Sequence, residues 1–197
     1  MKKIMQSLLT IAVLSACTTK EQPAADSAAM PASDQSAAAP AAGATAAVTD
    51  PQIAAIVVAA NTADIEAGRL AASKSGNAKV KEFAQRMITD HGGVNTAATA
   101  LVKKLGVTPE ETATSRQQTE GGAATRQTLQ GKTGVDFDRA YMANEVTYHQ
   151  NLLGAIDSVL LPSVQNAELK ALLDQTRPAV VSHLKAAQDL QGSLGTS

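Results

Sequence analysis

The chain has 197 residues, a formal net charge of −1, a 2% share of aromatic residues, no tryptophan and a single cysteine. The near-neutral charge argues against the basic surface that nucleic-acid binding requires, and one cysteine excludes an intrachain disulfide framework. With so few aromatic side chains, the core must rely on aliphatic residues and close alanine contacts, which is typical of packed helices.

The N-terminus has the features of a bacterial lipoprotein signal. Two lysines precede the apolar stretch IMQSLLTIAVLSA, which is too short to span a bilayer and has the proportions of a secretory signal. It ends in LSAC, which resembles a lipobox, so we expect residues 1–16 to be removed and Cys17 to be lipidated. The lipid would attach the chain to a membrane, and Thr18 favours the outer membrane, facing the periplasm. An ordinary signal peptide followed by an incidental cysteine is the alternative.

Residues 17–49 are rich in alanine, proline and serine and nearly lack bulky apolar side chains. Such a segment cannot bury enough surface to offset its ordering entropy, so we predict a disordered tether. A coil of about 32 residues would hold the next domain on the order of 30 Å from its anchor. Residues 50–192 suffice for one domain with a core, and 193–197 are expected to form a disordered tail.

Four amphipathic helices are predicted in this domain. The first has Asp50 as its N-cap and Pro51 at its first position, and the second starts at Asn77 and closes with Gly106 as its C-terminal glycine. The predicted ranges are 51–75, 77–105, 135–161 and 167–191. No stretch shows the alternation of a strand, so the domain is predicted to be all-α.

The link between the second and third helices is long, polar and glycine-bearing. Its TPEE segment at 108–111 matches a capping box for a short helix, and at most one more short helix is predicted around 123–129. Short loops within the two helix pairs and a long link between them predict a four-helix bundle of the ferritin-like type, with the link crossing along the bundle. A plain up-down-up-down topology stays open.

Polar residues interrupt the apolar stripes of all four helices. The chain's three histidines are His91, His149 and His183, one each on the second, third and fourth helices. Glu145 precedes His149 by four residues and so faces the same side of the helix. At 1.5 Å per residue, either topology places these side chains in a mid-bundle layer roughly 8 Å deep.

The first helix offers two carboxylates near its middle. They are Asp64 and Glu66. Glu66 is in phase with Ala63 and Leu70 and is therefore expected to reach the layer. Imidazole and carboxylate from facing helices are the ligands of metal sites inside bundles. The candidate ligands for zinc, copper or iron are Glu66, His91, Glu145, His149 and His183.

Two interpretations of the layer stay open. A bound metal would suit a metal-binding or stress-related role, whereas a buried polar network without metal would only fix the packing of a structural or interaction module. A di-iron centre needs Glu-x-x-His twice, and Ala179 and Val180 stand where an acid would be needed before His183. The pattern therefore argues against a ferroxidase. No nucleophile elbow or phosphate-loop pattern supports other enzymatic chemistry, although an enzyme of unidentified substrate stays an alternative. The sequence identifies no protein partner and leaves self-association open.

The segment MITDHGGVNTA raises a local question, because Gly92 and Gly93 lie inside the second predicted helix. We predict that the helix continues through them, and that they allow close approach of another segment. Asp90, about 100° around the helix from His91, is expected to cap or orient a neighbour.

Three blocks carry a family resemblance: ADIEAGRLAASKSGNAKVKEFAQRMITDH, FDRAYMANEVTYHQ and LKALLDQTRPAVVSHLKAAQDL. They resemble an uncharacterised family of secreted bacterial proteins, often described as outer-membrane proteins, whose domain of unknown function is ferritin-like. The resemblance covers about residues 50–190 and implies no activity. The motif positions that it implies are Glu66, Asp90, His91, Glu145, His149 and His183. Gly92 and Gly93 depart from the larger polar residues expected there.

Overall fold

The computed structural model describes residues 47–195, which contain no strand and five helices of at least 18 residues. The all-α prediction is confirmed. The predicted signal peptide, Cys17 and most of the predicted tether lie outside the described residues. None of the helices in the described part has the length and hydrophobicity needed to cross a bilayer.

The first two helices, α1 (Asp50–Lys74) and α2 (Ala78–Leu105), follow the predicted punctuation closely. Asn77 caps α2, because its Oδ1 accepts the backbone N–H groups of Lys79 at 2.9 Å and Val80 at 3.3 Å. Gly106 ends α2 in the left-handed conformation, with φ of 65°.

The N-cap of α1 differs from the prediction by one residue. Thr49 holds this position, and its backbone N–H donates to Gln52 Oε1 at 3.1 Å in a capping box. The carboxylate of Asp50 accepts the backbone N–H groups of Gln165 at 2.9 Å and Asn166 at 2.8 Å. Asp50 therefore ties the start of α1 to the segment before the last helix.

The predicted link contains a helix that the sequence pattern did not indicate. It is α3 (Ala113–Gln130), and its capping box is formed by Thr112 and Ser115, four residues after the predicted one. Only Ser115 and Leu129 of this helix are buried. The expectation of short helices here is wrong, because α3 lies against α1 and gains its stability from that contact.

The last part of the bundle begins with α4 (Gly134–Ala155), which continues through a π-helical segment, η1 (Ile156–Leu160), into α5 (Leu161–Ser163). The final helix, α6 (Ala167–Gly195), extends past the predicted end of the domain. Leu194 near its end is 6% exposed, and its carbonyl oxygen accepts two hydrogen bonds from Arg139. The described start of the expected tail is therefore helical.

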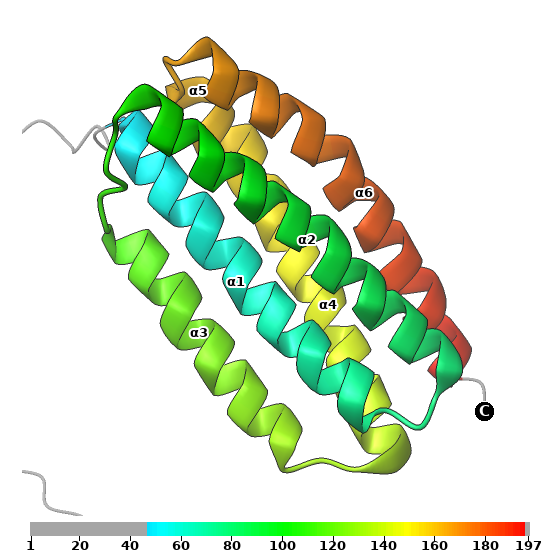
Figure 1. Ribbon diagram of the computed structural model, residues 1–197. Helices are drawn as coiled ribbons and strands as arrows, with labels where there is room; N and C mark the ends of the chain where they lie inside the picture. Colours follow the sequence, from blue (N-terminus) through cyan, green and yellow to red (C-terminus); the bar gives the residue numbers. More distant parts are fainter. Residues whose placement is uncertain (1–46, 196–197) are drawn as a thin grey trace, which may run out of the picture. The chain divides into compact units, whose positions relative to one another are not determined.

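The helices α1, α2, α4 and α6 form the bundle, and α3 lies outside it along α1 (Figure 1). α1 and α2 are antiparallel, as are α4 and α6, and α2 packs against α6. Because α3 returns along the bundle after α2, α4 starts at the end where α2 started, and the two run in the same direction (Figure 1). The link thus crosses along the bundle, as predicted, but does so as a helix.

The core consists of two apolar clusters with a polar layer between them. On α1, one cluster contains Ile53, Ile56 and Val57, and the other contains Ala67 and Ala71. The same alternation of cluster, polar residues and cluster recurs along α2, α4 and α6. The buried side chains between the clusters, which we call the polar layer, are Asn61, Asp64, His91, Glu145, His149 and His183.

The helix α2 runs through Gly92 and Gly93 without a break, as predicted. The expectation that these glycines allow a close approach is wrong, because a Cβ at either position would meet no atom within 4 Å. The close approaches lie elsewhere. A Cβ on Gly68 would lie 3.1 Å from the carbonyl oxygen of Ala84, and a Cβ on Gly122 would lie 2.6 Å from the Cβ of Ala63.

We expect Gly122→Ala to lower the free energy of unfolding by about 1–3 kcal/mol, because its methyl group overlaps Ala63 and α3 must move away from α1. Gly121→Ala is the matched control, since its methyl group would meet no atom within 4 Å. This change should raise the free energy by about 0.5–1 kcal/mol through helix propensity. Urea unfolding measures both, and equal effects would contradict the close contact of α3 with α1.

Candidate metal centre

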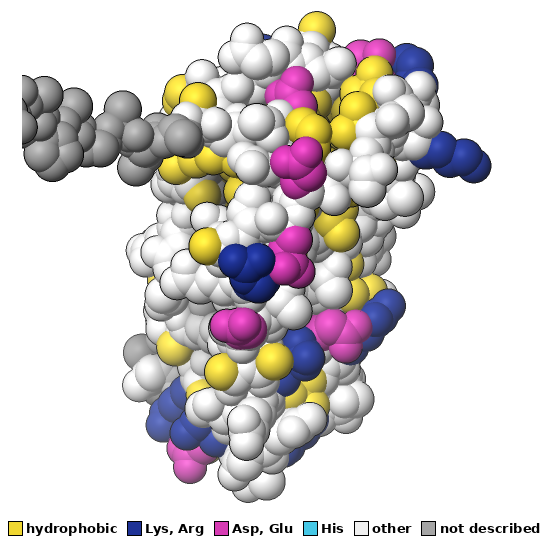
Figure 2. Space-filling view, turned by 90° about the vertical axis from the view of Figure 1, so that its left-hand side faces the viewer, with side chains coloured by type: hydrophobic (Ala, Val, Ile, Leu, Met, Phe, Trp, Pro, Cys, Tyr) yellow, Lys and Arg dark blue, Asp and Glu magenta, His cyan; other side chains and the backbone are white. Residues whose placement is uncertain are grey.

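The polar layer is almost completely withdrawn from solvent. His149 and Glu145 are 0% exposed, and His183, His91 and Asp64 are 1–2% exposed. The space-filling view toward α3 shows acidic and basic side chains interspersed, and no histidine surfaces among the described residues on this face (Figure 2). Polar groups buried to this extent are costly unless each one has a partner.

Each histidine of the layer has one ring nitrogen bound to a fixed oxygen. Nδ1–H of His91 donates to Asn61 Oδ1 at 2.6 Å, and Nδ1–H of His149 donates to the carbonyl oxygen of Glu145 at 2.9 Å. Nε2–H of His183 donates to Asp90 Oδ2 at 2.8 Å. In a neutral ring, such an acceptor leaves the second nitrogen with a lone pair, and that nitrogen is the one that could bind a metal.

The three imidazoles lie together in one group. Their ring centroids are 5.3–5.5 Å apart, and each ring brings one nitrogen within 4.8 Å of the other two. His91 Nε2 and His149 Nε2 are 3.4 Å apart. Two nitrogens bound to one metal ion at about 2.0–2.1 Å with a tetrahedral angle lie about 3.3 Å apart. The His91–His149 pair therefore already has the spacing of two metal ligands.

A carboxylate lies beside this group. Asp64 Oδ2 is 2.9 Å from His91 Nε2, and neither Asp64 oxygen has a hydrogen-bond partner. Two atoms that bind the same cation lie close together without forming a hydrogen bond to each other, as Asp64 Oδ2 and His91 Nε2 do. Nδ1 of His183, the lone-pair nitrogen of that ring, is likewise buried without a partner. Both Asp64 oxygens and His183 Nδ1 are thus buried without a hydrogen-bond partner, whereas His91 Nε2 and His149 Nε2 are 3.4 Å from each other.

Glu145 and Asp64 are neighbouring buried carboxyl groups whose pKa values are shifted in opposite directions. Ligand oxygens of both lie within 4.8 Å of a nitrogen of His149 and of each other. Burial raises the pKa of Glu145 well above its ordinary value, and the charge of Asp64 raises it further. Burial opposes ionisation of Asp64 too, but His91 and His149 lower the pKa of Asp64 below its ordinary value. The pKa of Asp64 therefore lies below that of Glu145, and Asp64 is the carboxyl group that ionises more readily.

Two of the histidines are held neutral by their surroundings. Burial lowers the pKa of His183 to about 4, although its hydrogen bond to Asp90 acts in the opposite direction. Burial likewise lowers the pKa of His149. Neutral imidazole is the form that binds metal, so no proton has to leave these two rings at pH 7.

We expect the metal-free protein to lose stability as the pH falls from about 6.5 toward about 4. His183 has an ordinary pKa of 6.5 and a folded-state pKa of about 4, so between these values the unfolded chain binds a proton that the folded chain does not. Each pH unit in this window removes up to about 1.4 kcal/mol for one such group. Urea unfolding at stepped pH should show a shallower slope for His183→Gln, and parallel slopes would contradict burial of a neutral ring.

The structure brings together four of the five candidate ligands, namely His91, Glu145, His149 and His183. It does not bring Glu66 to them, because Glu66 is partly exposed and ion-paired with Arg69. Asp64 holds the inward position on α1. The signal was present in the sequence, because Asp64 continues the buried series Ile53, Val57, Ala60, Ala67 and Ala71 at three- and four-residue spacing.

Two supporting residues complete the centre. Asp90 orients His183, as expected from its place beside His91, and Arg86 Nε donates to the same Asp90 oxygen at 3.3 Å. Asn61, which orients His91, was not predicted. It lies one turn before Asp64 on the buried side of α1, and an uncharged amide on an apolar stripe is a weak signal.

The fold and the site together define a helical-bundle protein with a buried histidine–carboxylate layer. The chain belongs to the family described as "Domain of unknown function (DUF4142)", whose model matches residues 33–190. No curated protein and no solved structure matches the chain.

Proposed function

We propose that this protein is a lipid-anchored cell-envelope protein whose helical domain binds one transition-metal ion. The ligands are His91, His149, His183 and Asp64. One observation carries the proposal: each histidine has one ring nitrogen bound to an oxygen, and the three rings each bring a nitrogen within 4.8 Å of the others. Metal-binding histidines are oriented in this way by their outer partners.

The donor set favours zinc, copper or iron. Three imidazoles suit all of these ions, and a single carboxylate completes four-coordination. Glu145 lies close to Asp64 and His149, and burial together with the charge of Asp64 raises the pKa of Glu145 well above its ordinary value. The proposed ligand set contains one carboxylate, that of Asp64, which is fewer than a di-iron carboxylate centre uses.

The topology supports a ferritin-like assignment for the bundle. Two antiparallel pairs, α1 with α2 and α4 with α6, are joined by a connection along the bundle, as in ferritin-like folds. Lipid attachment at Cys17 and an outer-membrane location rest on the N-terminal sequence alone. Labelling with a radioactive fatty acid tests the attachment, and Cys17→Ser should abolish the label.

Metal content tests the proposal. Protein stripped with a chelator and then supplied with zinc, copper or iron should retain a single ion per chain after desalting, as measured by elemental analysis. The double variant His91→Ala/His149→Ala should retain none, and circular dichroism should show whether its helices remain. Failure of the wild-type protein to retain metal, or equal retention by the variant, would favour the alternative that the polar layer only fixes packing.

A further inference from the structure

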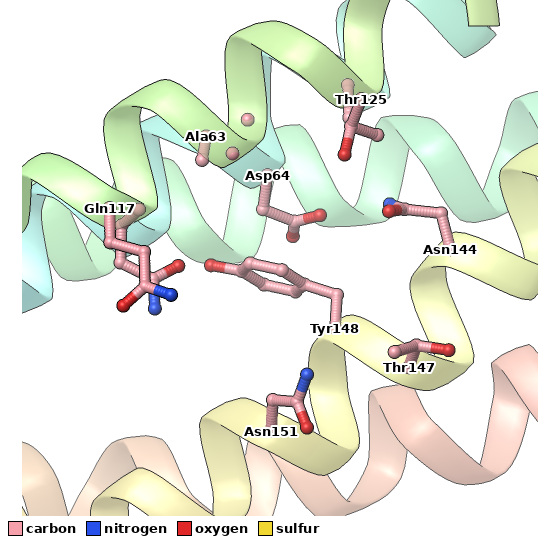
Figure 3. A pocket seen from close by; sticks show the side chains of 12 residues that line it. Ala63, Asp64, Gln117, Thr125, Asn144, Thr147, Tyr148 and Asn151 are labelled. Atoms are coloured by element: carbon pink, nitrogen blue, oxygen red, sulfur yellow. The ribbon is translucent and has the colours of Figure 1, made fainter. Parts of the chain in front are cut away.

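A cavity of about 440 Å³ lies between α1, α3 and α4, and it extends inward to the polar layer. Figure 3 shows Asp64 and Tyr148 within it, with Gln117 and Thr125 from α3 on one side and Asn144 and Asn151 from α4 on the other. Apart from Asp64, the side chains that line it are uncharged, and most are carboxamides and hydroxyls. The cavity thus offers neutral oxygen atoms around one buried anion.

Asp64 belongs to both the cavity and the candidate metal centre. It lines the cavity, and its Oδ2 lies 2.9 Å from His91 Nε2. Both of its oxygens are buried and have no hydrogen-bond partner. A buried carboxylate attracts a cation strongly, and the groups close to this one are His91, His149 and Glu145 rather than a lysine or an arginine.

A positively charged side chain lies on the side of the centre near α2 and α6. There Arg86 donates to Asp90 Oδ2 at 3.3 Å and to Ser182 Oγ at 3.0 Å, and Asp90 in turn accepts from His183. A cation approaching His183 from this side would meet the guanidinium group. The cavity over Asp64 has no lysine or arginine among its lining residues.

We propose that this cavity is the uptake route of a divalent cation to the centre. Amide and hydroxyl oxygens replace part of the hydration shell of the cation, and Asp64 then draws it to the lone pairs of His91 and His149. The ligand class is a hydrated divalent metal ion. This inference rests on the proposed metal-binding function. It adds that α3, which supplies none of the proposed ligands, controls the rate of loading.

Uptake kinetics of Co²⁺ test the route, because this ion absorbs visible light strongly when it becomes four-coordinate. Thr125→Phe places a bulky ring at the cavity, and Thr119→Phe makes the same change at the groove that α3 forms with α1 and α2. Thr125→Phe should slow uptake and release about tenfold, corresponding to a barrier raised by about 1.4 kcal/mol, and leave the equilibrium affinity unchanged. Thr119→Phe should match the wild-type protein.

A second variant tests the route independently, in case Thr125→Phe does not fold. Asn151→Leu keeps the side-chain size and removes a cavity oxygen on exposed α4 surface, so it too should slow uptake relative to the wild type. If the wild type binds Co²⁺ and all variants load at its rate, the route is overturned and the metal centre stands. If the wild type shows no four-coordinate Co²⁺ spectrum, the metal centre and the route are both overturned.

Discussion

Asp64→Asn is expected to weaken metal binding by about 100-fold or more, whereas Glu66→Gln, two residues further along α1, is expected to leave it unchanged. Asp64 is buried and lies 2.9 Å from His91 Nε2, so replacing its charge by an amide removes both a ligand and the anion that balances the metal. Glu66 is ion-paired with Arg69 at the surface, where such pairs contribute little. Competition against a chromophoric chelator measures both affinities.

The two variants also distinguish between the two possible rotations of α1 about its axis. If the helix were rotated as the sequence interpretation expected, Glu66→Gln would be the damaging change and Asp64→Asn the silent one. Both substitutions remove one negative charge and keep the side-chain size, so the change in net charge is the same in both. Equal loss of affinity in the two variants would contradict a specific role for Asp64.

A second large effect is expected on stability. Metal at about 1,000 times its dissociation constant should raise the free energy of unfolding by about 4 kcal/mol, because the ion binds the folded chain alone. For a domain of this size, that gain corresponds to a rise in melting temperature on the order of 10 °C. Zn²⁺ suits the measurement because it has no redox chemistry. Thermal unfolding followed by circular dichroism gives both values.

His149→Ala should abolish this rise. The variant also loses packing, because His149 is 0% exposed and its removal leaves a cavity. Comparing each protein with and without Zn²⁺ removes that contribution, since the metal-free form of each variant serves as its own reference. A Zn²⁺-dependent rise of the same size in His149→Ala would show that the ion binds elsewhere.

The sequence predicts the histidine part of the site because each histidine lies on or beside a long apolar stripe. Val80, Met87 and Ala98 define the buried face of α2, and His91 lies on that face, so its burial follows from helical spacing alone. Placement of the layer at mid-bundle follows from helix lengths. The choice between Asp64 and Glu66 depends on a rotation of about 200° around α1, and alanines on several faces of this helix blur its apolar side.

The sequence pattern does not reveal α3 because this helix has few apolar side chains of its own. Gly121 and Gly122 lower its intrinsic helix propensity, and only two of its residues are buried. Its stability comes from a tertiary contact, the close approach of Gly122 to Ala63, which no local pattern encodes. The glycines of α2 show the converse, because Gly92 and Gly93 suggest a contact that the structure does not contain.

The central claim is that one metal ion binds between the histidines of the polar layer. Anomalous diffraction at the zinc edge from crystals of the Zn²⁺-loaded protein tests it most directly. The account predicts one strong peak bounded by His91 Nε2, His149 Nε2, a ring nitrogen of His183 and Asp64 Oδ2. Peaks confined to surface carboxylates such as Glu66, with none inside the layer, would contradict it.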